Sequence, residues 1–501
     1  MSLNLASTVL ESARRHAGQP ALGAGITYSS LSFSIIAFAQ RLSEKGIQAG
    51  DRVAVMSENR PEFTVAYFAV LAIGAIVVPV NTLLSRREVS FCLSHAGVKG
   101  VVYSQLVSAA LSQSVADLDT APVLLELDSA INVVATETNP GKTQAFDVYP
   151  TSPDDTAVIF YTSGTTGQPK GAAVTHFNLH ANAQWVSEWS VGSKVTNRHW
   201  GPGHCALAVL SLSHSFGQTC MQNAPLMGGA CISYMARFEA AALVSQLVRD
   251  RVTLLAAVPR MIRELMALPP ESAQGLSFFQ YCLVGGAPID QPTVVAFEDR
   301  FSVSVLEGYG LSETSPVIAF RTPDLPRKKG SVGRAIRGVV IRIVDDGGRT
   351  LPLGEIGELA VKGEPVMKGY FRDSEATGLA IKEGWFYTGD LGYLDADGDV
   401  FLVDRKNDVI IRNGYNVYPA EVEKVLTDFP GVVEIAVVGI DDTECGQEIK
   451  AFVVGQVDVD LLKRFARDHL AAYKYPRIIE LVASLPKGSK GQVLRRELRK
   501  S

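Results

Sequence analysis

Short runs of apolar, β-branched residues alternate with helix-like patterns through the first 300 residues of the chain. RVAVMS (52–57) precedes PEFTVAYFAVLA (61–72), GAIVVPV (74–80) precedes SRREVSFCLSHA (85–96), and GVVYS (100–104) comes next. Strands that are buried on both faces read as continuous apolar runs, and a helix between two such strands makes them parallel. The alternation therefore predicts an α/β fold in which parallel-rich sheets are flanked by helices.

The pattern changes twice after that region. From about residue 330, short strands and turns such as VVIRIVDDGGRTLP (339–352) are typical of an antiparallel or barrel-like subdomain. After the charged stretch DRKND (404–408), the chain reads as strand, turn, helix and strand up to Ile440. We expect two parallel-rich αβ subdomains and a β-barrel-like subdomain in an N-terminal domain, residues 1–404, and a small α+β C-terminal domain, residues 405–501.

The apolar stretch from Phe63 to Val80 approaches the length of a membrane span. Gly74 and Pro79 interrupt it, so a buried helix, a turn and a buried strand account for it better. The first 20 residues lack a basic segment followed by an apolar core, and they read as an amphipathic helix instead of a signal peptide. We expect a cytoplasmic protein without a membrane span.

Charge and cysteine content exclude several classes of partner. The formal net charge of −5 gives no general attraction to nucleic acid or anionic lipid, so no nucleic-acid partner is expected. The six cysteines are scattered without a C-x-x-C pair, which suits reduced thiols and argues against a zinc site or a disulfide framework. An anionic ligand must therefore be held by a local group of residues.

The segment YTSGTTGQPKG (161–171) follows the apolar run TAVIF and combines hydroxyl residues, glycines and a lysine. Glycines let successive backbone N–H groups turn inward as an anion-binding nest, and Lys170 adds positive charge. The Walker pattern G-x-x-x-x-G-K-[ST] is absent, because Gly164 and Gly167 are three positions apart and Lys170 follows a proline. The alternative interpretation is an exposed serine- and threonine-rich loop. Such a loop rarely combines so many hydroxyl residues and glycines with a lysine directly after a strand. The segment predicts a phosphate-binding loop of another family.

This segment resembles the phosphate loop of the adenylate-forming superfamily, which comprises acyl-CoA synthetases, peptide-synthetase adenylation domains and luciferases. Further motifs follow in the family's order: LSHSFG (212–217), GGAP (285–288), EGYGLSE (307–313), YTGDLG (387–392) and DRKNDVIIRNGYNVYPAEVE (404–423). The resemblance covers essentially the whole chain. It implies an enzyme that joins a carboxylic acid to ATP with Mg²⁺ and then passes the acyl group from acyl-AMP to a thiol such as coenzyme A.

The resemblance also implies a nucleotide site. The β and γ phosphates would be held by Thr162, Ser163, Gly164, Thr165, Thr166, Gly167 and Lys170. The adenine would lie against Gly286, Ala287, Pro288, Glu307, Gly308 and Tyr309, and the ribose hydroxyls would be bound by Asp390 and Arg405. Ser312, where many members have threonine, would bind the α-phosphate, and the catalytic Glu313 would hold Mg²⁺.

The acyl and thiol sites follow from the same resemblance. His214 would be a catalytic residue that positions the acyl group, although a lone histidine in an apolar stretch is more often a satisfied core residue. The acyl group would contact His214, Phe216, Gly285 and Gly310, and coenzyme A would contact Arg412, Gly414 and Tyr415. The hinge of a mobile C-terminal domain would be Asn407, where aspartate or lysine is usual.

The identity of the acid and of the acceptor is less constrained. The chain has no carrier-protein segment after the C-terminal motifs, which favours diffusible coenzyme A over a tethered carrier protein. Amino-acid-activating members carry an aspartate soon after the aromatic position of the histidine motif, and HSFGQTCMQN has none. The sequence favours a hydrophobic carboxylic acid.

The C-terminal stretch PKGSKGQVLR (486–495) departs from the family pattern P-K-x-x-x-G-K-[VI]-x-R. The lysine of that pattern neutralises charge on the carboxylate and the α-phosphate during adenylation, and here its position holds Gln492. A glutamine amide brings no positive charge, so we expect adenylation to be about 10²- to 10³-fold slower. The motifs of the thioester half-reaction are intact.

Three hypotheses remain open at this point. The favoured one is an enzyme specialised for thioester formation, which receives its acyl-adenylate from a separate adenylating enzyme. The second is a complete acyl-CoA ligase in which Lys490 replaces the missing charge or Gln492 is of no consequence. The third is a non-catalytic protein that binds acyl-adenylates.

Overall fold

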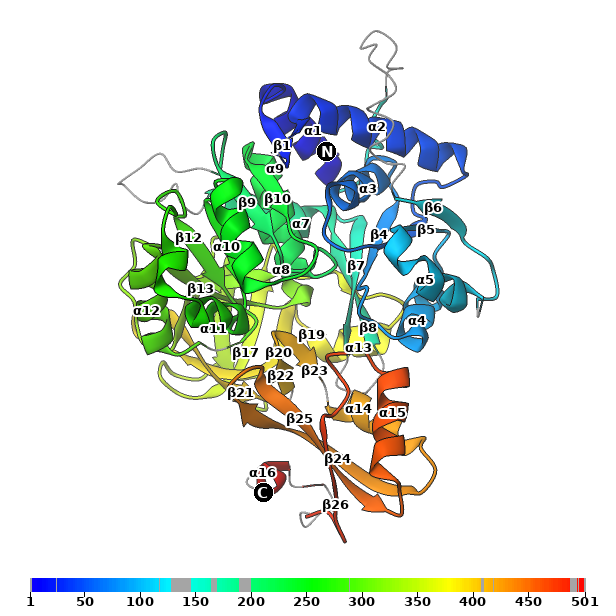
Figure 1. Cartoon of the computed structure of the whole chain (residues 1–501), viewed down its shortest axis with the longest axis vertical. Helices are drawn as coiled ribbons and strands as arrows, with labels where there is room; N and C mark the ends of the chain where they lie inside the picture. Colours follow the sequence, from blue (N-terminus) through cyan, green and yellow to red (C-terminus); the bar gives the residue numbers. More distant parts are fainter. Residues whose placement is uncertain are drawn as a thin grey trace.

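The computed structural model describes residues 2–23, 25–116, 118–127, 146–163, 169–188, 200–287, 289–406, 410–417, 419–486, 493 and 495–499. Within these residues the strands form three sheets (Figure 1). Two of the sheets belong to the larger, upper part of the molecule in Figure 1, and the third lies below them. The mixed α/β architecture with a large N-terminal and a small C-terminal part confirms the expected fold class.

The first sheet has the strand order β18-β8-β7-β4-β3-β5-β6. Strands β7, β4, β3, β5 and β6 are parallel, and β8 returns antiparallel to β7. The strands are β3 (Arg52–Met56), β4 (Ile76–Val80), β5 (Gly100–Tyr103), β6 (Val123–Glu126), β7 (Thr156–Ser163), β8 (Pro169–Thr175) and β18 (Gly369–Tyr370). The helices between them are α3 (Pro61–Ala72), α4 (Arg86–Ala96) and α5 (Ser108–Val115), with the short η1 (Gln105–Val107).

The stretch from Phe63 to Val80 folds as the sequence predicts. It forms the buried helix α3, a turn in which Gly74 has φ +76°, and the buried strand β4. Of the described helices, none is both long enough and apolar enough to cross a membrane. Helix α4 begins with a capping box between Ser85 and Glu88, so Glu88 is fixed at the start of a helix whose later turns pack on the sheet.

The second sheet runs in the order β16-β17-β20-β21-β15-β14-β13-β12-β11-β9-β10-β1-β2, with β19 beside β20. Its parallel half contains β1 (Pro20–Leu22), β9 (Cys205–Ala208), β10 (Cys231–Tyr234), β11 (Leu254–Ala257), β12 (Tyr281–Val284) and β13 (Ser304–Gly310), and β2 (Ile26–Thr27) is antiparallel at its edge. Its antiparallel half, the expected barrel-like part, contains β14 (Val317–Phe320), β15 (Ser331–Ala335), β16 (Val339–Val344), β17 (Gly357–Gly363), β19 (Ile381–Lys382), β20 (Trp385–Leu394) and β21 (Asp399–Arg405).

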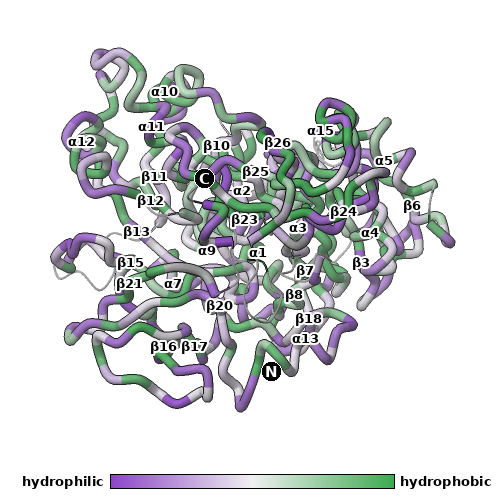
Figure 2. Tube along the Cα trace, turned by 90° about the horizontal axis from the view of Figure 1, so that it is seen from below, coloured by the Kyte–Doolittle hydropathy of each residue, from purple (hydrophilic) through white to green (hydrophobic). Residues whose placement is uncertain are grey.

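Helices of this larger part are α1 (Leu5–Arg15), α2 (Tyr28–Glu44), α7 (His176–Glu188), α8 (Ser215–Gln218), α9 (Ala224–Gly228), α10 (Ala240–Arg249), α11 (Pro259–Ala267), α12 (Gln291–Phe301) and α13 (Ser374–Ala380). Single turns are η3 (Thr219–Asn223), η4 (Pro270–Ala273) and η5 (Ser312–Thr314). The expected amphipathic N-terminal helix is confirmed as α1, whose buried residues face the main core. Figure 2 shows both hydrophilic and hydrophobic residues along α12. The six cysteines are free, as expected.

The C-terminal residues form a separate sheet of order β23-β22-β25-β24, with β26 beside β25. Its strands are β22 (Ile410–Arg412), β23 (Tyr415–Val417), β24 (Val432–Asp442), β25 (Gly446–Gly455) and β26 (Ile478–Leu481), and its helices are α14 (Pro419–Thr427), α15 (Val459–His469) and α16 (Arg495–Leu498). On one face, Val437, Ala451 and Val453 pack in the core that includes α14 and α15. The opposite face carries Ala436, Val438 and Phe452.

Candidate active site

A cavity of about 990 Å³ lies where the two large sheets and the C-terminal domain meet. The chain enters it just after strand ends: Asn81 follows β4, Val209 follows β9, and Gly285 follows β12. Ligand sites of α/β proteins are found at such carboxyl ends of parallel strands. The C-terminal domain closes the cavity with Arg412, Asn413, Gly414, Tyr415, Tyr473, Lys474 and Arg477.

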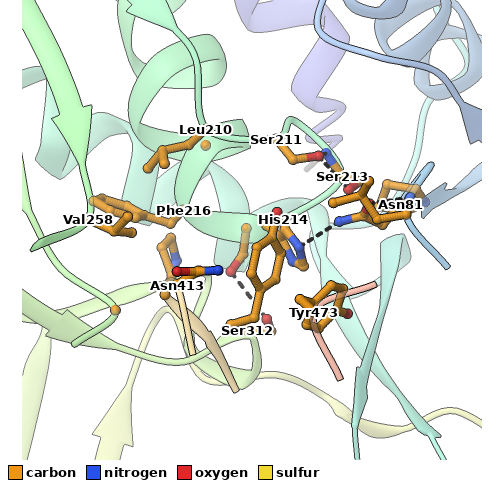
Figure 3. A pocket seen from close by; sticks show the side chains of 18 of the residues that line it. Asn81, Leu210, Ser211, Ser213, His214, Phe216, Val258, Ser312, Asn413 and Tyr473 are labelled. Atoms are coloured by element: carbon orange, nitrogen blue, oxygen red, sulfur yellow. Dashed lines mark hydrogen bonds between the residues drawn. The ribbon is translucent and has the colours of Figure 1, made fainter. Parts of the chain in front are cut away.

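His214 lies at the centre of this cavity, directly before helix α8 (Figure 3). Its Nε2 atom lies 2.9 Å from Nδ2 of Asn81. Burial, with a further contribution from the nearby Lys474, lowers the pKa of His214 to about 4. The imidazole is therefore neutral at pH 7, and it is held by a side chain from the end of β4.

The turn between β22 and β23 reaches this histidine from the C-terminal domain. The ring of Tyr415 lies 5.4 Å from that of His214, and Tyr473 stacks on Tyr415 at 4.0 Å. Gly414 has φ +78°, and a Cβ atom at this position would lie 2.6 Å from Cγ1 of Val258. Only glycine allows the turn to pack this closely on Val258, so the C-terminal domain is seated directly against the wall of the cavity.

Arg412, the predicted coenzyme A residue before this turn, is already engaged within its own domain. Its Nε and one terminal nitrogen donate to the two carboxylate oxygens of Glu448 at 2.8 and 3.0 Å. A bidentate arginine–carboxylate pair of this kind fixes both side chains. The guanidinium therefore shapes the base of the β22–β23 turn.

An ion bridge joins the two domains beside the cavity. Lys474 Nζ donates to Glu88 of α4 at 2.8 Å and to Glu421 of α14 at 2.7 Å. The side chains of Lys474, Glu88 and Glu421 are 4%, 9% and 5% exposed. Nearby, the Ser85 hydroxyl donates to the carbonyl oxygen of His469 at 3.1 Å. The first turn of α4 is thus the N-terminal domain's docking surface for the C-terminal domain.

The predicted metal residue, Glu313, is buried and lines the same cavity. Its Oε1 accepts hydrogen bonds from the Thr162 hydroxyl at 3.3 Å and from the Tyr370 hydroxyl at 3.1 Å. The described residues contain no group of three or more His, Cys, Asp or Glu side chains placed to hold a metal ion. A single carboxylate beside hydroxyl groups fits Mg²⁺ that takes its remaining ligands from water and nucleotide phosphates.

The predicted ribose and phosphate residues lie around β20, β21 and β8. Asp390 is buried and accepts a hydrogen bond of 2.5 Å from the Tyr309 hydroxyl, and it pairs across the sheet with Arg405, whose side chain lies outside the described residues. Ser312 is 3.3 Å from the hydroxyl of Ser215. The ammonium of Lys170 lies over the ring of Tyr370 at 5.1 Å. These contacts link the predicted nucleotide residues to the wall that holds His214.

The structure brings many of the predicted residues together. Those that line the cavity are Thr162, His214, Phe216, Gly285, Gly286, Gly308, Tyr309, Gly310, Ser312, Glu313, Arg412, Gly414 and Tyr415. Glu307 does not line it, and its carboxylate lies 3.8 Å from Arg327. Ala287, Lys170 and Asp390 also stand outside the lining. The predictions for Gly164, Thr165, Thr166, Gly167, Pro288, Asn407, Gln492 and the side chain of Ser163 fall outside the described residues.

Sequence reasoning missed several side chains of this site. Asn81, Tyr473, Lys474 and Glu88 line the cavity, and so does Asn413, which has φ +54° and a buried Oδ1 that has no hydrogen-bond partner within the described part of the chain. The position of Asn81 immediately after an apolar strand was an available signal. The sequence carries no signal for the pairing of Glu88 with Lys474, because 386 positions separate the two residues.

The chain on either side of the C-terminal stretch with Gln492 lies on the far face of the C-terminal sheet. Leu485, before this stretch, and Leu498, after it, pack with Ala436, Val438 and Phe452. Tyr415 and Tyr473, which face the cavity, pack with the core on the opposite face. In Figure 1, α16 is correspondingly found below the sheet and away from the N-terminal domain.

Comparison with known sequences finds matches along nearly the whole chain. The sequence profile of the AMP-binding enzyme family matches residues 9–371, and that of the AMP-binding enzyme C-terminal domain matches residues 421–492. Feruloyl-CoA synthase from an Amycolatopsis species is 33% identical over 485 residues, 95% of this chain and 94% of the relative. Long-chain-fatty-acid–CoA ligase from Bacillus subtilis is 32% identical over 530 residues, 99% and 94% of the two chains.

Solved structures of similar proteins cover this chain completely. The o-succinylbenzoate CoA synthetase of Bacillus subtilis, a double mutant bound to a product analogue, has a TM-score of 0.87 and 28% identity, and 98% of its chain is covered. ATP-bound MatB from Rhodopseudomonas palustris has a TM-score of 0.74 and 29% identity, and 99% of its chain is covered.

Proposed function

Since the chain belongs to the AMP-binding enzyme family, among relatives that are acyl-CoA synthetases, we propose that it is specialised for the thioester half-reaction. In that half-reaction the acyl group passes from acyl-AMP to coenzyme A. Acyl-CoA synthetases of this family use ATP, coenzyme A and Mg²⁺. In our proposal this chain acts mainly in the second step, and a separate enzyme supplies the acyl-adenylate.

The observation that carries the proposal is the contact between the β22–β23 turn and His214. Tyr415 lies against the imidazole, Gly414 packs on Val258, and the buried bridge from Lys474 to Glu88 holds the two domains in this arrangement. Because Gly414 has no side chain, the backbone of the turn lies directly against Val258 at this point. The C-terminal domain thus completes the wall of the cavity in which the thioester half-reaction is proposed to take place.

The chemistry of this step is a transfer between two carbonyl derivatives. The sulfur of coenzyme A forms a bond to the acyl carbon, the bond from that carbon to the phosphate oxygen breaks, and AMP leaves with the electron pair. The thiol proton goes to water. The neutral His214 and the backbone of Gly285 and Gly310 surround the position proposed for the acyl group, where they orient it.

Impaired adenylation is the second part of the proposal. Gln492 stands at the position where the family pattern has lysine, and Leu485 and Leu498, on either side of that stretch, pack on the sheet face opposite Tyr415. Without a lysine, the charge that develops between carboxylate and α-phosphate lacks a partner, which costs about 3 to 4 kcal/mol. Glu313 would still hold Mg²⁺ and neutralise part of the phosphate charge. We propose Asn407 as the hinge of a C-terminal domain that starts at residue 405.

The proposed acyl group is hydrophobic. Apolar side chains on the inner wall of the cavity include Leu210, Phe216, Val258, Met261, Val317 and Phe320. The relatives named above act on feruloyl and long-chain acyl groups, and both kinds of group are largely apolar. We propose a hydrophobic carboxylic acid as the source of the acyl group and coenzyme A, instead of a carrier protein, as the acceptor.

A paired assay tests the proposal. Feruloyl-AMP and a long-chain acyl-AMP are each mixed with coenzyme A and thioester is measured; in parallel, the free acids are mixed with ATP and Mg²⁺ and pyrophosphate is measured. The proposal predicts rapid thioester formation and slow pyrophosphate release. Equally fast release of pyrophosphate would identify a complete ligase, and failure in both assays over a broad panel of acids would identify a non-catalytic acyl-adenylate-binding protein.

A further inference from the structure

Each end of the Asn81 side-chain amide has its own hydrogen-bond partner. Its Oδ1 accepts a hydrogen bond of 2.8 Å from the backbone N–H of Leu83, and its Nδ2 lies 2.9 Å from Nε2 of His214. The residue is 7% exposed, so its side chain is largely shielded from bulk solvent. The Leu83 N–H fixes which end of the amide faces the histidine, because a flipped amide would set two donors against each other.

This arrangement determines the tautomer of His214. An amide nitrogen can donate a hydrogen bond but cannot accept one, so Nε2 of His214 must be the acceptor. A neutral imidazole carries its proton on one nitrogen, and the other nitrogen of this ring is Nδ1. The lowered pKa of His214 keeps the ring neutral at pH 7. His214 therefore carries its proton on Nδ1.

The Nδ1–H group is available to a ligand. Among the described residues, Nδ1 has no hydrogen-bond partner, and His214 lines the cavity. Asn81 also faces Tyr415 of the β22–β23 turn: burial raises the pKa of Tyr415, and a hydrogen bond with Asn81 opposes that rise. The amide is thus placed between the histidine and the part of the C-terminal domain that closes the site.

We propose that Asn81 is a positioning residue that holds His214 with its proton on Nδ1, so that His214 donates a hydrogen bond to the acyl carbonyl oxygen during thioester formation and does not take the thiol proton. The assignment of the step rests on the proposed function, whereas the tautomer rests on the hydrogen bonds of Asn81 and on the neutral state of His214. Negative charge grows on the carbonyl oxygen as sulfur attacks, and a preorganised donor stabilises that charge.

The tautomer is measured directly by NMR. The full chain is labelled with ¹⁵N-histidine and its two-bond ¹H–¹⁵N couplings are recorded at pH 7.5, with the His214 signals assigned from their loss in a His214→Asn variant. We expect Nδ1 to be protonated in the wild type. In Asn81→Asp, the carboxylate still accepts from Leu83 and now also accepts from His214, so the proton is expected to move to Nε2. A wild-type ring protonated on Nε2, or the same tautomer in both proteins, would overturn the assignment.

Kinetics then separate a donor from a base. Asparagine places an N–H near the position of Nδ1, whereas glutamine places one near Nε2, so His214→Asn should retain at least tenfold more thioester formation than His214→Gln. For Asn81→Asp we expect kcat for thioester formation to fall about 100-fold with little change in KM for coenzyme A. Equal loss in the two histidine variants would show that His214 acts as a base. Absence of thioester formation in the wild type would refute the proposed function and leave the NMR result to decide the tautomer.

Discussion

Replacing Lys474 with methionine tests the ion bridge on which the domain arrangement depends. Lys474 Nζ lies between Glu88 of the N-terminal domain and Glu421 of its own domain, at 2.8 and 2.7 Å. Burial alone would lower the pKa of Lys474, but Tyr473 and the two carboxylates raise it well above the ordinary value. Methionine fills a similar volume and leaves both carboxylates without a cation.

The expected cost falls on the docked arrangement. Removing one partner of a buried ion pair costs about 3 to 5 kcal/mol. We take the lower end, because burial raises the pKa of Glu421 and this carboxyl can accept a proton once the ammonium is gone. About 3 kcal/mol corresponds to roughly 100-fold in an equilibrium constant. Thioester formation from acyl-AMP and coenzyme A should therefore slow by about 100-fold.

The assay compares the two half-reactions with a matched control. Both are measured in a Gln492→Lys background, so that adenylation is fast enough to follow. Lys450→Met is the control, because Lys450 also forms a lysine–carboxylate pair, with Glu480 at 2.9 Å, but entirely within the C-terminal domain. Thioester formation in Lys474→Met within threefold of the control would refute the reasoning. Equal slowing of both half-reactions would likewise show that the bridge stabilises the fold and not the docked arrangement.

Three further predictions concern separate parts of the molecule. Gln492→Lys should raise the rate of pyrophosphate release by about 10²- to 10³-fold and leave the rate of thioester formation unchanged. Lys490→Gln is the control. An unchanged rate of pyrophosphate release in Gln492→Lys would contradict the charge argument. Gly414→Ala should slow thioester formation about tenfold, because Gly414 has φ +78° and the new methyl group would meet Val258. A second substitution, Val258→Ala, should restore part of the rate. An undiminished rate in Gly414→Ala would disprove the close packing. Burial lowers the pKa of His176 to about 4, so between pH 6.5 and 4 the unfolded chain binds a proton that the folded chain does not. The free energy of unfolding, measured in urea, should fall by about 3 kcal/mol over that range from this residue, and His176→Asn should remove that part of the slope; an unaltered slope would refute the assignment.

Local patterns were sufficient for much of the fold. The break of the apolar stretch at Gly74 and Pro79 predicted α3 and β4, because glycine allows the positive φ of the turn between them. The alternating runs predicted parallel sheets, although β8 returns antiparallel to β7. That return was missed because residues 161–171 were assigned to a phosphate-binding loop, so the strand that begins at Pro169 was not recognised.

The site was predictable where its residues stand in motifs and not where the fold brings distant residues together. His214 and Gly414 were found from their motifs, and both line the cavity. Lys474 and Glu88 were missed, because a charged residue in a sequence is most often solvated and only the docked domains bury this pair. Glu307 was expected at the adenine, and the structure places its carboxylate outside the cavity lining, 3.8 Å from Arg327.

The central claim is that this chain has kept the thioester half-reaction and has largely lost adenylation. The most direct measurement is a single-turnover comparison with enzyme in excess: the rate at which feruloyl-AMP or a long-chain acyl-AMP forms from acid, ATP and Mg²⁺, against the rate at which the same adenylate is consumed with coenzyme A. The account predicts that formation is about 100-fold slower than consumption, or slower still. An adenylate that forms as fast as it is consumed would contradict it.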